Sequence, residues 1–168
     1  PEWRLIQALN KIRDANVKIL IKVWYDAITP ITRNDINLIK KEPFDAAGFK
    51  KEYGVKTFVG NKNALDAKKA LVSGVTCNIA GIESGYIGDG AKTVLPGTAK
   101  VKIDFRLVPK MDPKKLIKLL SRHLRVHGFS DISINVLNAE AAARTAGGTA
   151  RSSRDHWLSI PRRSLDAI

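Results

Sequence analysis

The sequence is poor in cysteine, in acidic residues and in long apolar runs. One cysteine, Cys77, occurs among its 168 residues, so no disulfide forms within the chain and no thiol cluster is available for zinc. No stretch approaches the roughly 18–20 apolar residues that span a bilayer, and the opening Pro-Glu-Trp-Arg is not a basic-then-apolar leader. These absences argue against a disulfide scaffold and a membrane partner, and they favour a cytoplasmic location.

The shortage of acidic residues leaves a strong positive balance. Lys and Arg number 29 against 16 Asp and Glu, which gives a formal net charge of +13. Such a balance is typical of nucleic-acid-binding proteins. These cations are spread along the whole chain, however, and an acidic partner domain would offset them equally well. The share of hydrophobic residues, 44%, is that of a globular domain, and we disfavour nucleic-acid binding.

Apolar residues recur at helical spacing in five segments. The expected helices cover residues 2–13, 35–41, 46–53, 63–72 and 113–127. The last has the clearest limits, because Asp112 suits an N-cap and Pro113 suits the first helical position. Gly128 is placed to end this helix in the left-handed conformation.

Alternating apolar residues predict strands over residues 17–24, 75–80, 99–108 and 131–137. The clearest is Ala99–Val108, which follows a glycine-rich loop, Gly81–Gly97. Its apolar face consists of Ala99, Val101, Ile103, Phe105 and Leu107. Its charged face consists of Lys100, Lys102, Asp104 and Arg106.

The order of these elements predicts an α+β fold. One more strand before Pro1 would complete the βαββαβ order of a ferredoxin-like antiparallel sheet, with two helices on one face and a polar face left for a partner. Residues 17–74 are expected to form a helical elaboration between the first helix and the sheet. Residues 1–138 thus form one domain, and residues 139–168, which lack apolar periodicity, form a linker or irregular tail.

Five stretches carry a resemblance to a known family: Cys77–Tyr86, Gly90–Pro96, Lys102–Pro109, Trp24–Asp26 and Glu42–Asp45. Together they resemble the dinuclear zinc exopeptidases and amidohydrolases, which include carnosinase, cytosolic dipeptidases, aminoacylase and acetylornithine deacetylase. The elaboration is most similar to that of the dipeptidase and carnosinase branch. In this family a catalytic domain holds two zinc ions, and a smaller lid domain dimerises and closes over the substrate.

The resemblance places the chain on the lid domain. The family's His-x-Asp metal motif and its Glu-Glu pair are not found in it, so we expect neither a catalytic residue nor a metal ligand here. The two zinc ions would belong to the full-length enzyme, and the chain alone would be an inactive fragment of a hydrolase. Its expected partners are a second copy of itself, the missing catalytic domain, and a small peptide or N-acyl amino acid as substrate.

The expected substrate-binding residues lie on the clearest strand and in the loop before it. Arg106 lies on the charged face, and a guanidinium binds a carboxylate through two parallel hydrogen bonds. Its place in the Arg-Leu-Val-Pro motif implies that it binds the substrate's C-terminal carboxylate. In the loop Gly88–Thr93, glycines such as Gly90 allow backbone N–H groups to converge on an anion. Lys92 belongs to this loop, and the resemblance implies that Thr93 reaches the neighbouring subunit's site.

Relatives often carry a His on the strand before this loop. In them this His stabilises the oxyanion of the reaction in the site of the neighbouring subunit. Ala80 stands at the matching position here, so either this branch uses another hydrogen-bond donor, for which nearby Asn78 is the candidate, or its catalytic efficiency rests elsewhere. His123 and His127 have the i, i+4 spacing of a helical metal site, but no third ligand is evident, so no metal is expected. Cys77 faces inward and is interpreted as a small core residue.

Two other functions stay open at this point. An RNA-binding ferredoxin-like module would place stacking aromatic residues on the exposed face of the sheet. Here Phe105 falls on the inward face, and the outward row is charged. A ligand-binding regulatory domain is supported only by the shared topology.

Overall fold

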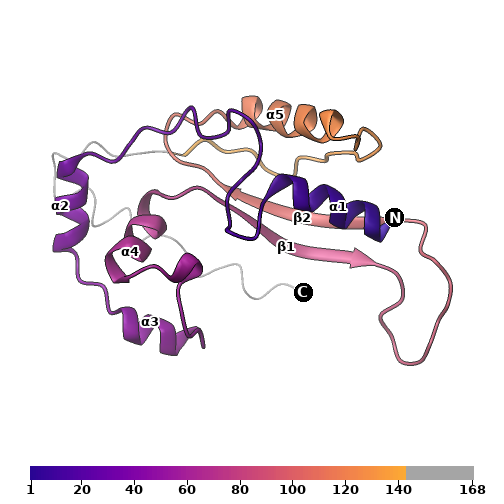
Figure 1. Cartoon of the computed structure of the whole chain (residues 1–168), viewed down its shortest axis with the longest axis horizontal. Helices are drawn as coiled ribbons and strands as arrows, with labels where there is room; N and C mark the ends of the chain where they lie inside the picture. Colours follow the sequence, from indigo (N-terminus) through magenta and orange to yellow (C-terminus); the bar gives the residue numbers. More distant parts are fainter. Residues whose placement is uncertain (143–168) are drawn as a thin grey trace.

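The computed structural model describes residues 1–142 (Figure 1). Residues 143–168, which include most of the expected tail, lie outside the described residues. The elements in chain order are α1 (Glu2–Ile12), α2 (Arg33–Lys41), α3 (Ala46–Glu52), the short 3-10 helix η1 (Val59–Asn61), α4 (Ala64–Ser73), β1 (Thr76–Ser84), β2 (Ala99–Arg106) and α5 (Pro113–Val126). All of the helices expected from the periodicity are present, close to their predicted limits.

The ends of α5 form as its flanking residues predict. The Asp112 carboxylate accepts a hydrogen bond from the Lys114 backbone N–H at 2.9 Å, and Pro113 occupies the first turn, where a missing N–H costs nothing. Beyond the helix, Gly128 has a φ of 82° and the Phe129 N–H donates to the Leu124 carbonyl at 2.9 Å. This left-handed ending turns the chain back so that Phe129 enters the core.

β1 and β2 form an antiparallel hairpin that contains one bulge. Cys77 pairs with Phe105, and the register shifts between Ile79 and Gly81, which leaves Ala80 as the extra residue. Along β2, half-buried and exposed side chains alternate without exception. The predicted apolar inner face and charged outer face of this strand are therefore confirmed, although the strand ends at Arg106 rather than at residue 108.

α1 and α5 lie side by side against the inner face of this hairpin (Figure 1). The core joins the two helices to the sheet, and its buried members include Ala8, Ile12, Cys77, Leu116 and Leu124. Trp24 also lies in this core, with its ring centroid 5.0 Å from that of Phe105. The α+β class, with an antiparallel sheet and two helices on one face, is confirmed.

The strand expected over residues 17–24 is wrong. Within the segment only Ile19 takes part in a bridge, with Arg13, and the other residues form bends, turns or irregular backbone. Val17 and Val23 have left-handed φ values of 69° and 62°, which interrupt an extended conformation near both ends of the segment. Ile19, Ile21 and Trp24 enter the core, whereas Val23 is 48% exposed, so the alternation matched burial in only part of the segment and without a strand.

The strand expected over residues 131–137 is also absent from the described part of the chain. In the ferredoxin-like order this last strand pairs with the first strand, whereas the sheet that the described residues form is the hairpin β1–β2 alone. The segment therefore has apolar alternation but no neighbouring strand to complete its backbone hydrogen bonds. An ion pair holds its beginning, because the Arg4 guanidinium donates to both Asp131 carboxylate oxygens at 2.5 Å.

α2, α3 and α4 gather at the end of the hairpin opposite the β1–β2 loop (Figure 1). Each begins at a side chain that accepts backbone N–H bonds: Thr32, Asp45 and Asn63. The Lys68 ammonium of α4 donates to the carbonyls of Ile39 and Glu42 at the end of α2, which ties the two helices together. No helix in residues 1–142 is long and apolar enough to cross a membrane.

Candidate functional site

Arg106 is the last residue of β2, and its side chain is exposed on the outer face of the hairpin. Its register partner is Thr76, the first residue of β1. Within residues 1–142, no acidic side chain forms an ion pair with Arg106. The guanidinium therefore presents its fork of N–H donors to solvent, which is the state that a carboxylate-binding arginine needs before its ligand arrives.

Asn78 lies on the same outer face, at the next outward pair along the hairpin, opposite Asp104. Arg13, which follows α1, reaches this point and donates to the Cys77 carbonyl at 2.7 Å and to Asn78 Oδ1 at 3.4 Å. The Asn78 amide oxygen is thus occupied, and its NH2 group is left as the donor. The structure brings Arg106 and Asn78 to one end of the hairpin and adds Arg13, which the sequence patterns do not single out.

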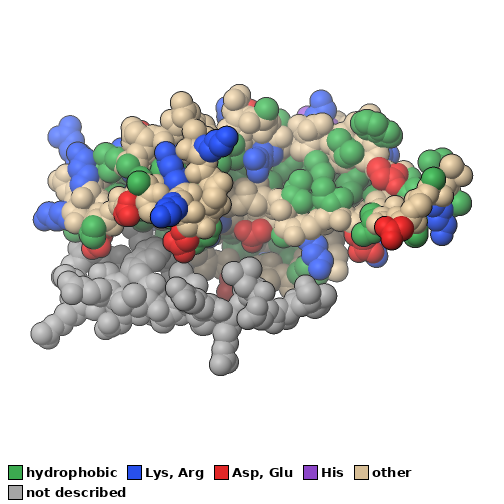
Figure 2. Space-filling view, turned by 90° about the horizontal axis from the view of Figure 1, so that it is seen from below, with side chains coloured by type: hydrophobic (Ala, Val, Ile, Leu, Met, Phe, Trp, Pro, Cys, Tyr) green, Lys and Arg blue, Asp and Glu red, His purple; other side chains and the backbone are tan. Residues whose placement is uncertain are grey.

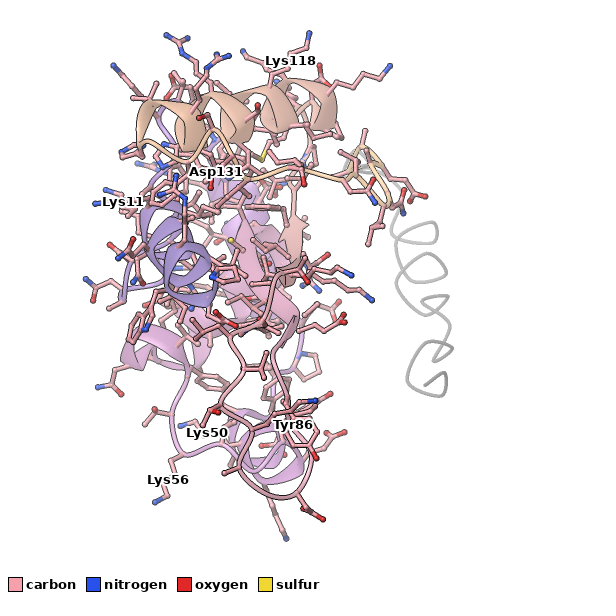
Figure 3. All side chains as sticks on the ribbon, turned by 90° about the vertical axis from the view of Figure 1, so that its right-hand side faces the viewer. Lys11, Lys50, Lys56, Tyr86, Lys118 and Asp131 are labelled. Carbon is pink, nitrogen blue, oxygen red and sulfur yellow. The ribbon has the colours of Figure 1, made fainter. Side chains whose placement is uncertain are left out.

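The loop between the strands is organised around Tyr86 (Figure 3). The Tyr86 hydroxyl donates to the Asp89 carbonyl at 2.9 Å, and the Lys92 ammonium lies 5.1 Å from the ring centroid. A Cβ on Gly88 would lie 2.6 Å from the Tyr86 hydroxyl, and Gly90 has a φ of 86°. Glycine is therefore required at both positions for this loop conformation. The sequence signal for Tyr86 was an aromatic residue at the start of a glycine-rich run.

The structure separates the expected residues into two groups. Arg106 and Asn78 lie near the open end of the hairpin, whereas Gly90, Lys92 and Thr93 belong to the loop at its closed end. β2 contains 8 residues, and a rise of roughly 3.3 Å per residue places its two ends roughly 23 Å apart. A small ligand cannot touch both groups of one chain at the same time.

The histidine pair and the cysteine have well-defined surroundings. His123 is 8% exposed, with Nε2 2.7 Å from the Lys11 carbonyl, and His127 Nδ1 lies 2.8 Å from the His123 carbonyl. Burial lowers the pKa of the His123 imidazole and raises the pKa of the Cys77 thiol to about 11. The described residues contain no cluster of three or more His, Cys, Asp or Glu side chains that could hold a metal ion.

Comparison with known proteins identifies relatives of the whole domain. The family model described as Peptidase dimerisation domain matches residues 3–132. The Beta-Ala-His dipeptidase of Homo sapiens is 30% identical over 128 residues, which cover 74% of this chain and 24% of that protein. The Cys-Gly metallodipeptidase DUG1 of Candida albicans is 31% identical over 124 residues, which cover 74% of this chain and 25% of that protein. The chain thus spans about a quarter of the length of these relatives.

Solved structures agree with these relatives. The M20 family metallo-carboxypeptidase Sso-CP2 from Sulfolobus solfataricus is similar with a TM-score of 0.71 at 36% identity, over 82% of this chain and 34% of that one. Human carnosine dipeptidase 1 is similar with a TM-score of 0.71 at 30% identity, over 78% of this chain and 27% of that one. The resemblance drawn from the sequence motifs is confirmed, and the chain belongs to the peptidase dimerisation domain family of the M20 metallopeptidases.

Proposed function

We propose that this chain is the dimerisation and substrate-capping domain of a metal-dependent dipeptidase or related amide hydrolase, and that it binds substrate without cleaving it. In the enzymes that the sequence resembles, two zinc ions held by a separate catalytic domain perform the chemistry, and this chain would supply none of their ligands. A small peptide or N-acyl amino acid is the proposed substrate. The cytoplasmic location stays a prediction from composition.

The observation that carries this proposal is the exposed guanidinium of Arg106, which forms no ion pair within residues 1–142. Closing the lid would remove that guanidinium and a substrate carboxylate from water together, and hydrogen bonds between charged groups each contribute about 1.5–3 kcal/mol. Asn78 supplies a nearby amide donor whose oxygen is already held by Arg13. These groups would hold the C-terminal end of a peptide and so orient its scissile amide toward the metals.

A homodimer would join the two separated groups of residues. β1 is an edge strand of the hairpin, and its outer edge has no partner in residues 1–142. In a two-fold dimer that pairs the two β1 edges antiparallel, Thr76 of one chain lies near Ser84 of the other. The loop of the second chain then lies beside Arg106 of the first. Each composite site would consist of Arg106 and Asn78 from one subunit, with Gly90, Lys92 and Thr93 from its partner.

An apolar surface flanks the same edge. It comprises Trp3 (77% exposed), Ile6 (44%), Ile79 (51%) and Ile82 (60%). A hydrogen bond of 2.7 Å between the side chains of Ser84 and Glu2 places the start of α1 beside the end of β1. Figure 2, which views the molecule from the β1 side, shows hydrophobic side chains gathered next to the projecting loop. Such patches mark protein interfaces, so this face would supply the apolar contact of the dimer.

Titration with a dipeptide tests the carboxylate role. Glycylglycine added to the 15N-labelled chain should shift the backbone resonances of Thr76, Asn78 and Arg106, whereas glycylglycinamide, which lacks the carboxylate, should not. Arg106→Gln should abolish the response. The matched control is Lys102→Gln, which removes an exposed positive charge from the same face of β2 and should leave the response intact.

The two parts of the proposal fail separately. If glycylglycine and its amide cause the same shifts, or if Arg106→Gln and Lys102→Gln behave alike, the carboxylate role is wrong. The dimer is tested on its own by the light-scattering mass of the chain and of Ile82→Glu. A mass that stays monomeric across the accessible concentration range would end the dimer proposal and leave the carboxylate result untouched.

A further inference from the structure

A recess with a volume of about 360 Å³ lies between α5 and the turn that carries Lys22 and Val23. Its volume falls within the range of roughly 300–1,000 Å³ that small-molecule sites occupy. It is lined by Lys22, Val23, Leu119, Arg122, His123, Val126 and His127. None of the residues proposed above for substrate binding is among them, so the recess is a second place where a ligand would be held.

The lining combines two kinds of side chain. Val23, Leu119 and Val126 provide apolar contacts, and Val23 and Val126 are 48% and 72% exposed although both are aliphatic. The remaining lining residues are bases, Lys22 and Arg122 together with the two histidines, and none of the described residues that line the recess is acidic. Neither Lys22 nor Arg122 forms an ion pair within residues 1–142. An apolar surface bordered by unpaired cations is complementary to an amphipathic anion.

The backbone around the recess is held in place. The Tyr25 hydroxyl accepts the Ile19 N–H at 2.8 Å, and the Trp24 N–H donates to the Ile21 carbonyl at 3.2 Å. Between them, Val23 is fixed at a φ of 62°. Strained residues of this kind persist only where the surrounding structure fixes them, and they cluster at ligand sites. The constrained backbone at Val23 therefore fixes the position of one wall of the recess.

The end of α5 does not oppose an anion here. Its last carbonyls carry a partial negative charge when they are left unpaired. The His123 carbonyl accepts the His127 N–H at 3.2 Å, the Arg125 carbonyl accepts the Gly128 N–H at 3.1 Å, and the Leu124 carbonyl accepts the Phe129 N–H at 2.9 Å. These three carbonyls are thus occupied by hydrogen bonds, and the side chains that line the recess are basic or apolar.

We propose that this recess binds a small organic carboxylate that has an apolar body. The carboxylate lies between Lys22 and Arg122, and the apolar body lies against Val23, Leu119 and Val126. The guanidinium provides the paired N–H donors that match a carboxylate, and the ammonium adds a second charge-assisted hydrogen bond. The ring of His123, fixed by the bond to the Lys11 carbonyl, closes one side of the recess.

Phenylacetate is the probe. Phenylacetamide, which is neutral, and acetate, which lacks the apolar body, are the controls. Added to the 15N-labelled chain, phenylacetate should shift the resonances of Val23, Arg122 and Val126 and should bind at least tenfold more tightly than either control. Arg122→Gln should weaken phenylacetate binding about tenfold, because a charge-assisted hydrogen bond contributes on the order of that factor. The matched control is Lys118→Gln, one turn earlier on the outer side of α5 (Figure 3), which should change the affinity less than twofold.

The controls also define the outcomes that overturn the proposal. Equal binding of phenylacetamide would show an apolar hollow without a carboxylate site, and equal binding of acetate would show only ion association at a basic surface. Equal losses in Arg122→Gln and Lys118→Gln would show that general charge, not the recess, attracts the probe. A zinc chloride titration that shifts His123 and His127 at lower concentration than phenylacetate would assign the recess to a metal instead.

Discussion

Replacement of Val17 by glycine is expected to stabilise the chain. Val17 ends the turn that begins at Asp14, where its N–H donates to the Asp14 carbonyl at 3.1 Å, and its φ is 69°. A left-handed conformation costs a residue with a Cβ about 1–2 kcal/mol, and the β-branched side chain of valine makes it worse. Glycine removes this cost but gives back about 0.5–1 kcal/mol through the greater freedom of the unfolded chain. The net gain is about 1 kcal/mol, or about 2–4 °C in Tm.

Urea denaturation and thermal melting, both followed by circular dichroism, measure this change. The matched control is Val94→Gly, because Val94 is 71% exposed in the hairpin loop and does not have a positive φ. Val94→Gly should lose stability only because glycine gives the unfolded chain more conformational freedom. Val17→Ala should fall between the wild type and Val17→Gly, since it removes the branch but keeps the Cβ. Equal shifts of the same sign in Val17→Gly and Val94→Gly would refute the argument from backbone strain.

Three further predictions concern single contacts. The Cys77 thiol, whose pKa burial raises to about 11, should resist iodoacetamide at pH 8 in the folded chain and react once urea unfolds it. Gly88→Ala should displace Tyr86, because the new Cβ would lie 2.6 Å from its hydroxyl, and should shift loop resonances without lowering Tm appreciably. The hydrogen bonds from Arg4 lower the pKa of Asp131, so its stabilisation is present above the unfolded pKa of about 3.9 and is lost as pH falls through the folded value. Asp131→Asn should therefore lower Tm at pH 7 and have a smaller effect at pH 2.5, measured by calorimetry.

Elements whose signals are local could be predicted from the sequence. α5 begins and ends where its capping residues indicate, because Asp112 and Gly128 act on backbone groups within a few positions of themselves. The two faces of β2 follow from the period of two along one strand. These features do not depend on which distant segment packs against them.

The wrong strands depended on distant partners or on unusual backbone conformations. Apolar and polar residues alternate over residues 131–137 as they do in a strand, but a strand also needs a neighbouring strand with which to exchange backbone hydrogen bonds. Residues 17–24 alternate as well, yet Val17 and Val23 occupy a conformation that valine strongly disfavours. No argument from residue propensity would assign a left-handed conformation to Val17 or Val23.

The sequence names candidate site residues one by one but does not predict how they are arranged. Arg106 is exposed, as the alternation along its strand predicted, and it forms no ion pair within residues 1–142. The distance between Arg106 and the loop follows from the length of the hairpin, which local patterns leave uncertain by several residues. Arg13 contributes through a contact with a backbone carbonyl of a distant segment, which no sequence pattern indicates. Tyr86 contributes through a contact within its own loop, which only its place beside a glycine-rich run indicates.

A mixed-isotope experiment tests the composite site most directly. A nitroxide is attached to Thr93→Cys in unlabelled chains, while the buried Cys77 stays unmodified, and these chains are mixed with 15N-labelled chains that carry no nitroxide. Any paramagnetic broadening in the labelled chains then comes from a partner subunit. The account predicts broadening of the Thr76 and Arg106 resonances that disappears when Ile82→Glu prevents association. A stable dimer in which these resonances stay sharp would show that the loop does not reach the partner's Arg106, and would contradict the account.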